Sequence, residues 1–243
     1  MAISTIMKNL SMATVGAVMI ALGVAGTAQA QTIIDTTPSW NGTDSIIPFG
    51  ENNTATYGQT FTVGSDNVLN DFTFWLNDFD GQSDVVDFAA YVTEWDGFKA
   101  TGSILYQSGP QSTTNAPGFE QFTFNTGGIG LTSGKQYVAF LSASNFFDGI
   151  PGTAELGATG FQDVYSGGDF VFYNNGSDFS LLTQNTWDYT GAGGFGDSAF
   201  KASFSQAIAS VPEPTTMLGI LAFGAFGLGS LHKRKQQKTT VKA

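Results

Sequence analysis

The chain has no cysteine and only one histidine, His232, among its 243 residues. Without cysteine it forms no disulfide bond, thiolate metal site or cysteine nucleophile. His232 lies in a basic segment outside the expected folded part, so we expect neither a Ser-His-Asp triad nor a histidine-bound metal there. Basic residues are also scarce: nine lysines and arginines accompany twenty acidic residues, a net charge of −11. This balance excludes nucleic acid as a partner, because phosphates are bound by clustered lysine and arginine.

The charges are unevenly distributed along the chain. Residues 31–210 contain three lysines and nineteen acidic residues, a net charge of −16, whereas residues 232–243 contain five basic residues and no acidic one. Such a contrast between a body and a tail is typical of membrane or targeting segments. The body also contains 31 aromatic residues, enough for a single sizeable core.

Residues 1–30 predict a secretory signal peptide. Lys8 precedes a short apolar run, and Ala28 and Ala30 occupy the two positions that a signal peptidase reads. The alternative, a transmembrane anchor, needs a longer apolar run. We therefore expect export of the chain and cleavage by signal peptidase before Gln31.

A second targeting element lies over residues 208–235. The uncharged, apolar run 215–231 predicts a transmembrane helix, since at ~1.5 Å per residue it approaches the thickness of the ~30 Å hydrocarbon core. The bases Lys233, Arg234 and Lys235 follow this run. Basic flanks stay on the cytoplasmic side, so we expect the body to lie outside the cytoplasmic membrane.

The order of these features carries a family resemblance. The motif before the apolar run consists of Val211, Pro212, Glu213 and Pro214. Together with the helix and the basic cluster it resembles the PEP-CTERM sorting signal of Gram-negative bacteria and cyanobacteria. The resemblance implies that an exosortase recognises Pro-Glu-Pro and processes the protein during export, usually in organisms that make an exopolysaccharide matrix. It extends over about residues 211–235, so it assigns neither the body nor the polar tail 236–243.

The body, residues 31–207, has the period-two alternation of β-strands and no strong helical period. Alternating apolar residues predict strands over 70–76, 85–94, 135–142 and 199–205, and phenylalanine pairs predict two more near 122–124 and 170–172. Glycine-, asparagine- and proline-containing pairs between them are typical of turns. The pattern predicts an all-β fold, an antiparallel Greek-key β-sandwich or jelly roll.

Two local patterns refine this expectation. The segment from Leu131 to Tyr137 resembles the tyrosine corner of Greek-key sandwiches, in which the tyrosine hydroxyl bonds to the backbone of the preceding turn. Together with the aromatic alternation it is similar to uncharacterised modules of bacterial surface proteins that carry this sorting signal. Further along, residues 174–176 (Asn-Asn-Gly) predict a hairpin turn that joins 169–173 to 179–182.

The densest group of oxygen ligands includes Asp78, Asp80 and Asp84. Calcium takes about six to eight such oxygens and often stabilises exported β domains. The spacing is not that of an EF-hand loop. A calcium site is therefore one interpretation, and a solvated acidic turn between two strands is the other; no other cofactor is expected.

Paired carboxylates offer a third class of function. Glu94 and Asp96 would share one face of a strand, ~6.5–7 Å apart, and together with Glu120 they provide the residue types that glycoside hydrolysis needs. With nineteen acidic residues in the body, such spacings also arise by coincidence. We expect no catalysis and keep a hydrolase as a distant alternative.

Trp75, Trp95 and Trp187 are candidates for an aromatic platform that stacks on sugar rings. Trp75 and Trp95 fall opposite the phenylalanine-rich face of their strands, which is compatible with exposure. The alternative is that both strands are central and buried on both sides.

Two hypotheses for the body follow. One is a non-catalytic structural or adhesive component of the cell surface or extracellular matrix. The other is a carbohydrate-binding module for matrix polysaccharide, in one version stabilised by calcium.

Overall fold

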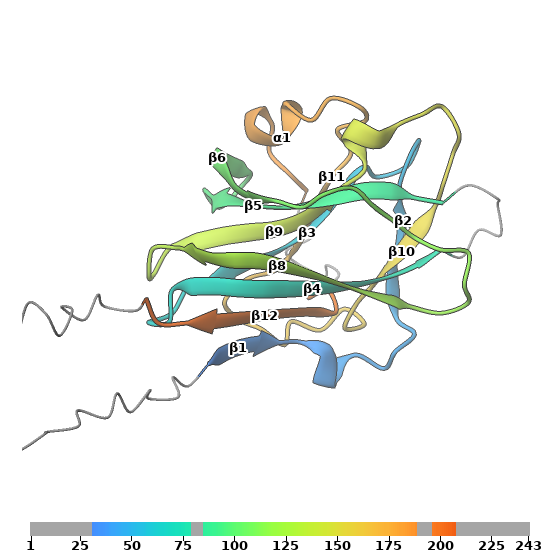
Figure 1. The fold of residues 1–243 in the computed structure, drawn as a ribbon. Coiled ribbons are helices and arrows are strands. Elements are labelled where there is room, and N and C mark those ends of the chain that lie inside the picture. Colours follow the sequence, from blue (N-terminus) through green and yellow to red (C-terminus); the bar gives the residue numbers. More distant parts are fainter. Residues whose placement is uncertain (1–30, 79–84, 189–195, 208–243) are drawn as a thin grey trace, which may run out of the picture.

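The computed structural model describes residues 31–78, 85–188 and 196–207. Within these ranges the chain forms two antiparallel sheets that pack face to face (Figure 1). Helical structure among them is confined to three short elements: η1 (Thr37–Ser39), η2 (Ser144–Phe146) and α1 (Leu181–Gln184). The predicted all-β sandwich is confirmed.

The first sheet, sheet A, has six strands. They are β1 (Thr32–Asp35), β2 (Ser45–Phe49), β4 (Val68–Asp78), β8 (Glu120–Gly130), β10 (Ala154–Gly157) and β12 (Phe200–Ser205). The order is β1-β12-β4-β10-β2, and β8 pairs with β4. The long strand β4 is thus the centre of the sheet, with β8 along one side and β12 and β10 along the other.

The second sheet, sheet B, also has six strands. They are β3 (Thr56–Thr62), β5 (Asp87–Trp95), β6 (Ala100–Gln107), β7 (Gln111–Ser112), β9 (Gln136–Ser142) and β11 (Phe170–Tyr173). The order is β11-β3-β9-β5-β6, and β7 pairs with β5. From β7 to β12 the chain changes sheet at every connection, as expected for a jelly-roll-like sandwich.

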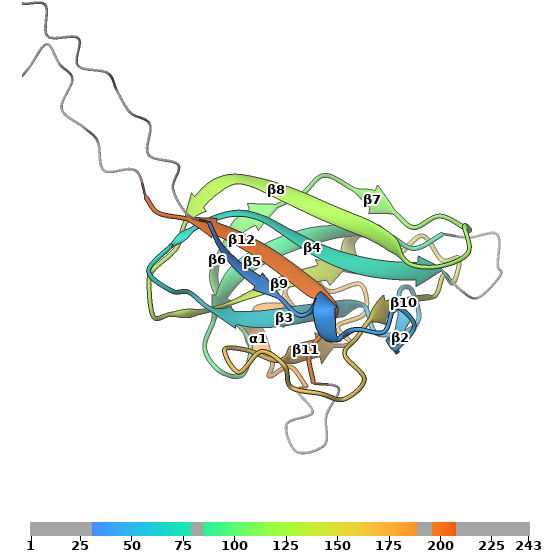
Figure 2. The same ribbon diagram turned by 90° about the horizontal axis from the view of Figure 1, so that it is seen from below.

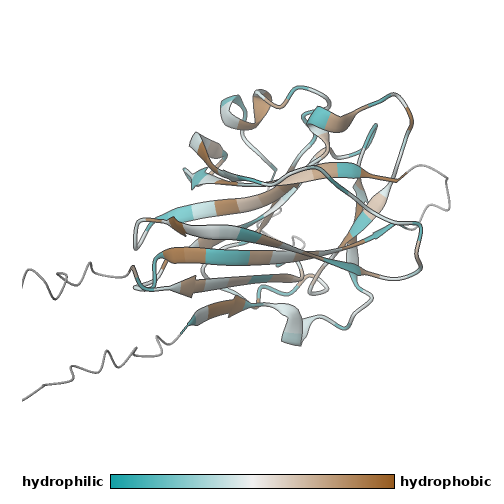
Figure 3. Ribbon diagram, viewed as in Figure 1, coloured by the Kyte–Doolittle hydropathy of each residue, from teal (hydrophilic) through white to brown (hydrophobic). Residues whose placement is uncertain are grey.

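The main core lies between the two sheets and follows from the alternation in the sequence. On β4 the side chains of Phe72, Phe74 and Leu76 are fully buried, whereas Thr73 between them is polar and Trp75 is half-buried. Figure 3 shows hydrophobic and hydrophilic residues alternating along the strands of the sandwich. Phe88 on β5 and Phe200 on β12 enter the same core. Successive strand residues point to opposite faces, so burying this aromatic set fixes which face of each sheet is inside.

A second, smaller core covers the outer face of sheet B. Val138 and Phe140 of β9 are buried there, although the neighbouring residues of β9 belong to the main core. The chain after β11, including α1, lies over this face and contributes Leu182 and Trp187. The central strands β3, β9 and β5 of sheet B are therefore buried on both faces, which explains the nearly continuous apolar run of β9, whereas the edge strand β6 is mostly exposed.

The tyrosine corner is confirmed. The Tyr137 side chain is 2% exposed, and its hydroxyl accepts a hydrogen bond from the backbone N–H of Thr132 at 2.9 Å. Gly134 in this turn has φ +80°, a left-handed conformation that glycine adopts without strain, and its N–H donates to the Val63 carbonyl. The corner therefore ties the start of β9 to the end of β3.

The predicted hairpin at residues 174–176 is wrong, because the chain leads from there into α1 and not into another strand. Asn175 is buried, and its side-chain oxygen accepts from the Thr56 hydroxyl while its amide donates to the Ser144 hydroxyl. The asparagine therefore connects β3 and η2 beneath the turn.

Both ends of the body lie at the same pole of the sandwich (Figure 2). The first strand, β1, pairs antiparallel with the last, β12, and Thr32 is the partner of Phe204. No helix in 31–78, 85–188 or 196–207 is long and apolar enough to cross a membrane. The signal peptide 1–30 and the helix 215–231 that the sequence predicts lie outside these ranges.

Replacing Tyr137 tests the tyrosine corner. Tyr137→Phe removes the acceptor of the Thr132 N–H, so we expect the free energy of unfolding to fall by about 1 kcal/mol, as measured by urea denaturation. Tyr91→Phe is the matched control, because the Tyr91 hydroxyl has only a 3.4 Å contact, from the Asn145 amide. Equal losses in the two variants would contradict a specific role for the corner.

Candidate functional site

The tryptophans predicted to form a sugar platform do not lie on one surface, because Trp75 is on β4 of sheet A, Trp95 on β5 of sheet B and Trp187 in the segment after α1. Trp95 and Trp187 are 8% and 1% exposed in the second core, with ring centroids 5.4 Å apart. Trp75 instead lies on the outer side of sheet A and is half-buried. The single platform of all three is therefore wrong, because the chain around α1 covers two of them.

Trp75 has other aromatic neighbours on the outer side of sheet A. The ring of Trp40 lies 5.9 Å from that of Trp75, and the ring of Phe119 lies edge-on to Trp40 at 4.9 Å. All three side chains are half-buried. We call Trp40, Trp75 and Phe119 the outer aromatic cluster.

A glycine and a backbone hydrogen bond fix the position of Trp40. A Cβ atom on Gly157 of β10 would lie 2.8 Å from the Trp40 ring, so the absence of a side chain lets the indole rest on the strand. The indole N–H donates to the Asp44 carbonyl at 2.8 Å. Sequence reasoning missed both Trp40 and Phe119, although Trp40 stands out as an aromatic residue in a polar, turn-rich stretch.

Polar side chains lie next to the outer aromatic cluster on the same face. Asn77 follows Trp75 by two residues on β4, and its amide donates to the Glu155 carboxylate at 2.6 Å. The other oxygen of Glu155 accepts from the Ser45 hydroxyl at 2.5 Å. The buried Oδ1 atom of Asn77 has no hydrogen-bond partner among the described residues. The face therefore combines aromatic rings with amide, carboxylate and hydroxyl groups.

The predicted calcium ligands are only partly placed, because Asp80 and Asp84 lie outside the described residues. Asp78, at the end of β4, is 7% exposed and accepts a hydrogen bond from the Thr113 hydroxyl at 2.7 Å. The described part of the chain brings no three acidic or histidine side chains together around a common point. The calcium site stays a prediction.

The three carboxylates considered for glycoside hydrolysis each have local partners. Glu94 on β5 forms an ion pair with Lys135 at 3.2 Å. Asp96 lies beyond the end of β5 and accepts from two backbone N–H groups of its own turn. Glu120 is on the other sheet and accepts from the N–H of Thr114 at 2.7 Å. Strand β5 ends at Trp95, between Glu94 and Asp96, so these two carboxylates do not share one face of a strand as predicted.

The three lysines of the described body all have acceptors within the chain. Lys135 pairs with Glu94, and Lys201 pairs with Asp35 at 3.7 Å. The Lys99 ammonium donates to the backbone carbonyl of Gln184 at 3.2 Å. The body thus has no cluster of lysines in its described part that could hold an anionic ligand.

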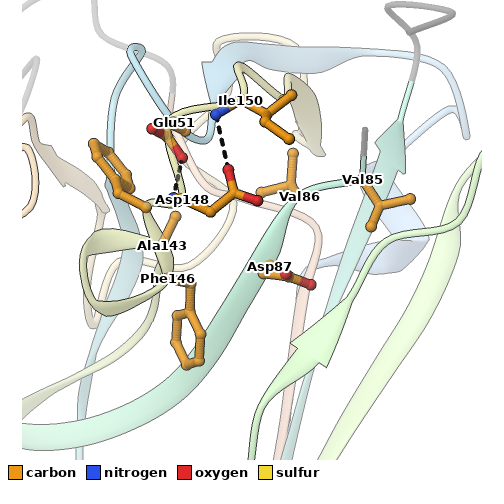
Figure 4. Close-up of a pocket in the computed structure, with 10 residues that line it drawn as sticks. Glu51, Val85, Val86, Asp87, Ala143, Phe146, Asp148 and Ile150 are labelled. Carbon is orange, nitrogen blue, oxygen red and sulfur yellow. Dashed lines mark hydrogen bonds between the residues drawn. The ribbon is translucent and has the colours of Figure 1, made fainter. Parts of the chain in front are cut away.

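A small pocket is lined by residues that include Glu51, Val86 and Asp148 (Figure 4). The Glu51 carboxylate accepts from the backbone N–H groups of Asp148 and Gly149, and the Asp148 carboxylate accepts from the N–H of Ile150. The free space is about 10 Å³, close to what one water molecule needs. The carboxylates therefore hold the loop in place and leave no room for a larger ligand.

Asp197 is the most deeply buried carboxyl group of the described chain, with 0% exposure. It accepts from the Gln59 amide at 2.7 Å and from the backbone N–H groups of Val164 and Tyr165 at 2.8 Å each. The Gln59 oxygen in turn accepts from the N–H and hydroxyl of Ser198. Burial raises the pKa of Asp197, although these hydrogen bonds act in the opposite direction. The network links β3 to the start of β12 and is structural.

We expect the stability contributed by Asp197 to depend on pH. Because its pKa is higher in the folded than in the unfolded state, its contribution is fully present below the unfolded pKa and is lost as pH rises through the folded pKa. Asp197→Asn abolishes this titration and mispairs the amide of Gln59, which should cost about 1–3 kcal/mol. In urea denaturation from pH 4 to 7, the deficit of the variant should shrink as pH rises.

Asp188→Asn serves as the control, since it removes an exposed carboxylate that is not among the groups shifting the pKa of Asp197. Its effect on the free energy of unfolding should stay within about 0.5 kcal/mol. A deficit of Asp197→Asn that grows with pH would mean that the hydrogen bonds to the ionised form outweigh its burial.

The sequence motifs for targeting lie outside the described residues. These are the signal-peptidase positions Ala28 and Ala30, the motif Val211, Pro212, Glu213 and Pro214, and the bases Lys233, Arg234 and Lys235. The family model of the PEP-CTERM protein-sorting motif matches residues 210–235. A search of curated proteins found no match to the chain. The chain therefore carries a PEP-CTERM sorting motif and is an exported surface protein, anchored at the membrane before an exosortase processes it, with a β-sandwich as its body.

Proposed function

We propose that the body is a non-catalytic structural or adhesive component of the cell surface or extracellular matrix. The observation that carries this proposal is the way its polar groups are used. The buried carboxyl of Asp197 and the carboxylates of Glu51, Glu94, Asp96 and Glu120 all bind partners within the fold. A catalytic site needs polar groups aimed at a substrate, whereas these groups stabilise loops and strands.

The shape of the described surface supports the same proposal. A cavity of about 160 Å³ lies beside β2 and β10, and Asp44 is the single ionisable residue in its lining. Glycoside hydrolysis uses a pair of carboxyl groups flanking the scissile bond, and this cavity offers one.

Binding of carbohydrate is the second candidate function. It is favoured by the outer aromatic cluster, where Trp75 lies beside Trp40 and Phe119 on a face that also carries hydrogen-bonding groups. In this version the matrix polysaccharide would be the partner through which the protein adheres.

Calcium remains a proposed stabiliser of the body. Binding at Asp78, Asp80 and Asp84 would raise the melting temperature of the chain when Ca²⁺ is added, and Asp80→Ala should abolish the rise. A melting temperature that is independent of Ca²⁺ in the wild-type chain would remove this part of the proposal.

Glu213 is the test of sorting. Glu213→Ala alters the centre of the Pro-Glu-Pro motif, so we expect the full-length chain to accumulate in the membrane fraction of cells that contain the exosortase. Fractionation and immunoblotting measure this. Asp163→Asn, which also removes one acidic residue, should be processed like the wild type. Unchanged release of a shortened form from Glu213→Ala cells would refute the exosortase assignment.

A strain that lacks the chain tests the adhesive role. Cells that lack the chain should attach less to one another and to a surface than cells with the wild-type chain. Equal attachment, with the wild-type body detected outside the cells, would contradict the adhesive proposal while leaving the sorting assignment intact.

A further inference from the structure

We propose that the outer aromatic cluster (Trp40, Trp75 and Phe119) is a binding site for a neutral polysaccharide chain. The inference rests on the proposed adhesive function and names the ligand through which the body would adhere. Four properties of this face lead to it: partly exposed rings, adjacent hydrogen-bonding groups, the absence of described free cations, and its position on the sandwich.

The rings have the partial exposure that stacking requires. Trp95 and Trp187 are buried in the second core, whereas the cluster residues are half-buried on the open side of sheet A. An indole ring presents a large, rigid apolar surface together with a polar N–H, so it gains binding area at little cost in conformational entropy. The C–H faces of a pyranose ring are apolar and match such a surface.

The groups beside the rings suit the hydroxyls of a sugar. Asn77 and Glu155 are cross-strand partners on β4 and β10, and Gln121 of β8 is the partner of Trp75. Gln121 is exposed and therefore open to a ligand. Asn77 Oδ1 is a buried acceptor without a partner in the described chain, and such groups cost free energy until a donor reaches them. Because this oxygen is buried, a ligand hydroxyl reaches it only after the Asn77 side chain shifts, whereas the exposed Gln121 can donate and accept without rearrangement.

Charge selects a neutral ligand over an anionic one. The described body has three lysines, and Lys201, the lysine on sheet A, already pairs with Asp35. Glu155 lies beside the cluster, and the body as a whole has a net charge of −16. A polyanion would meet a negative potential here with no described cation to offset it, whereas a neutral glycan carries no charge and is not repelled.

The position of the cluster keeps it accessible. Ser205, near the exit of the chain toward the sorting motif, is the β-sheet partner of Val68. Trp75 lies seven residues further along β4, about 23 Å away at ~3.3 Å per residue. The cluster is therefore well separated from the pole at which both ends of the body lie, so a tethered chain can still present it to a polymer.

Affinity electrophoresis of the purified full-length chain in detergent tests the proposal. Native gels would contain a neutral β-glucan, a neutral mannan or anionic polygalacturonate. We expect at least one neutral polymer to retard the wild-type chain, with no retardation by polygalacturonate. Trp75→Ala and Phe119→Ala should each weaken the retardation about tenfold or more, since central aromatic residues carry much of the binding energy in such sites.

Phe98→Ala is the matched control, because Phe98 is a 58% exposed aromatic side chain in the turn between β5 and β6, on the other sheet. It should bind like the wild type. Trp75→Tyr keeps a ring and should retain most of the affinity, and thermal melting of each variant identifies any that fail to fold. Retardation by neither neutral polymer, equal binding by Trp75→Ala, or a preference for polygalacturonate would overturn the proposal.

The two proposals fail in different experiments. If attachment of cells is independent of the chain but the purified protein binds a neutral polymer through Trp75, the adhesive role is wrong and the site stands. If the chain supports attachment but no polymer binds at the cluster, the site is wrong and adhesion uses another surface.

Discussion

The burial of the central strands of sheet B on both faces is the constraint on which the organisation of the molecule depends. Main-core side chains cover its inner face, and the segment around α1 covers its outer face with Leu182 and Trp187. Two of the four tryptophans of the chain, Trp95 and Trp187, are buried in this second core. Over the outer face of sheet A the described residues form no second buried core of this kind, and the outer aromatic cluster there stays half-buried.

The alternation of apolar residues in short windows of the sequence predicted the strands that have one apolar face. The strands around Phe72, Phe88 and Phe200 were predicted because alternation survives wherever a strand has one apolar face. Strand β3 was missed, since the buried residues on its outer side are Thr56 and Thr60 and its central side chain is Gln59. Those polar groups are satisfied by partners far along the chain, which no short window reveals.

The sequence predicted Trp75 as a member of the candidate site but not its neighbours, because the neighbours are brought to it by tertiary structure. Trp75 and Trp95 occupy equivalent places in the alternation of their strands, yet one is half-buried and the other buried. What separates them is a covering segment about ninety residues beyond Trp95, and its path is a tertiary property. Likewise, Trp40 and Phe119 come from two loops, Trp40 contacts Trp75 and Phe119 contacts Trp40, and the bare backbone of Gly157 that receives Trp40 is a feature only of the folded sheet.

The pairing of the first strand with the last has a consequence for the order of events during export. Strand β12 ends only six residues before Val211, and its place in sheet A lies between β1 and β4. Sheet A can therefore be completed only when the chain up to Ser205 is available for folding. Until then β1 has no neighbour in the described part of the sheet, and the aromatic core is open along β4. The exported body thus depends, for closure of its core, on the strand that directly precedes the sorting motif in the sequence.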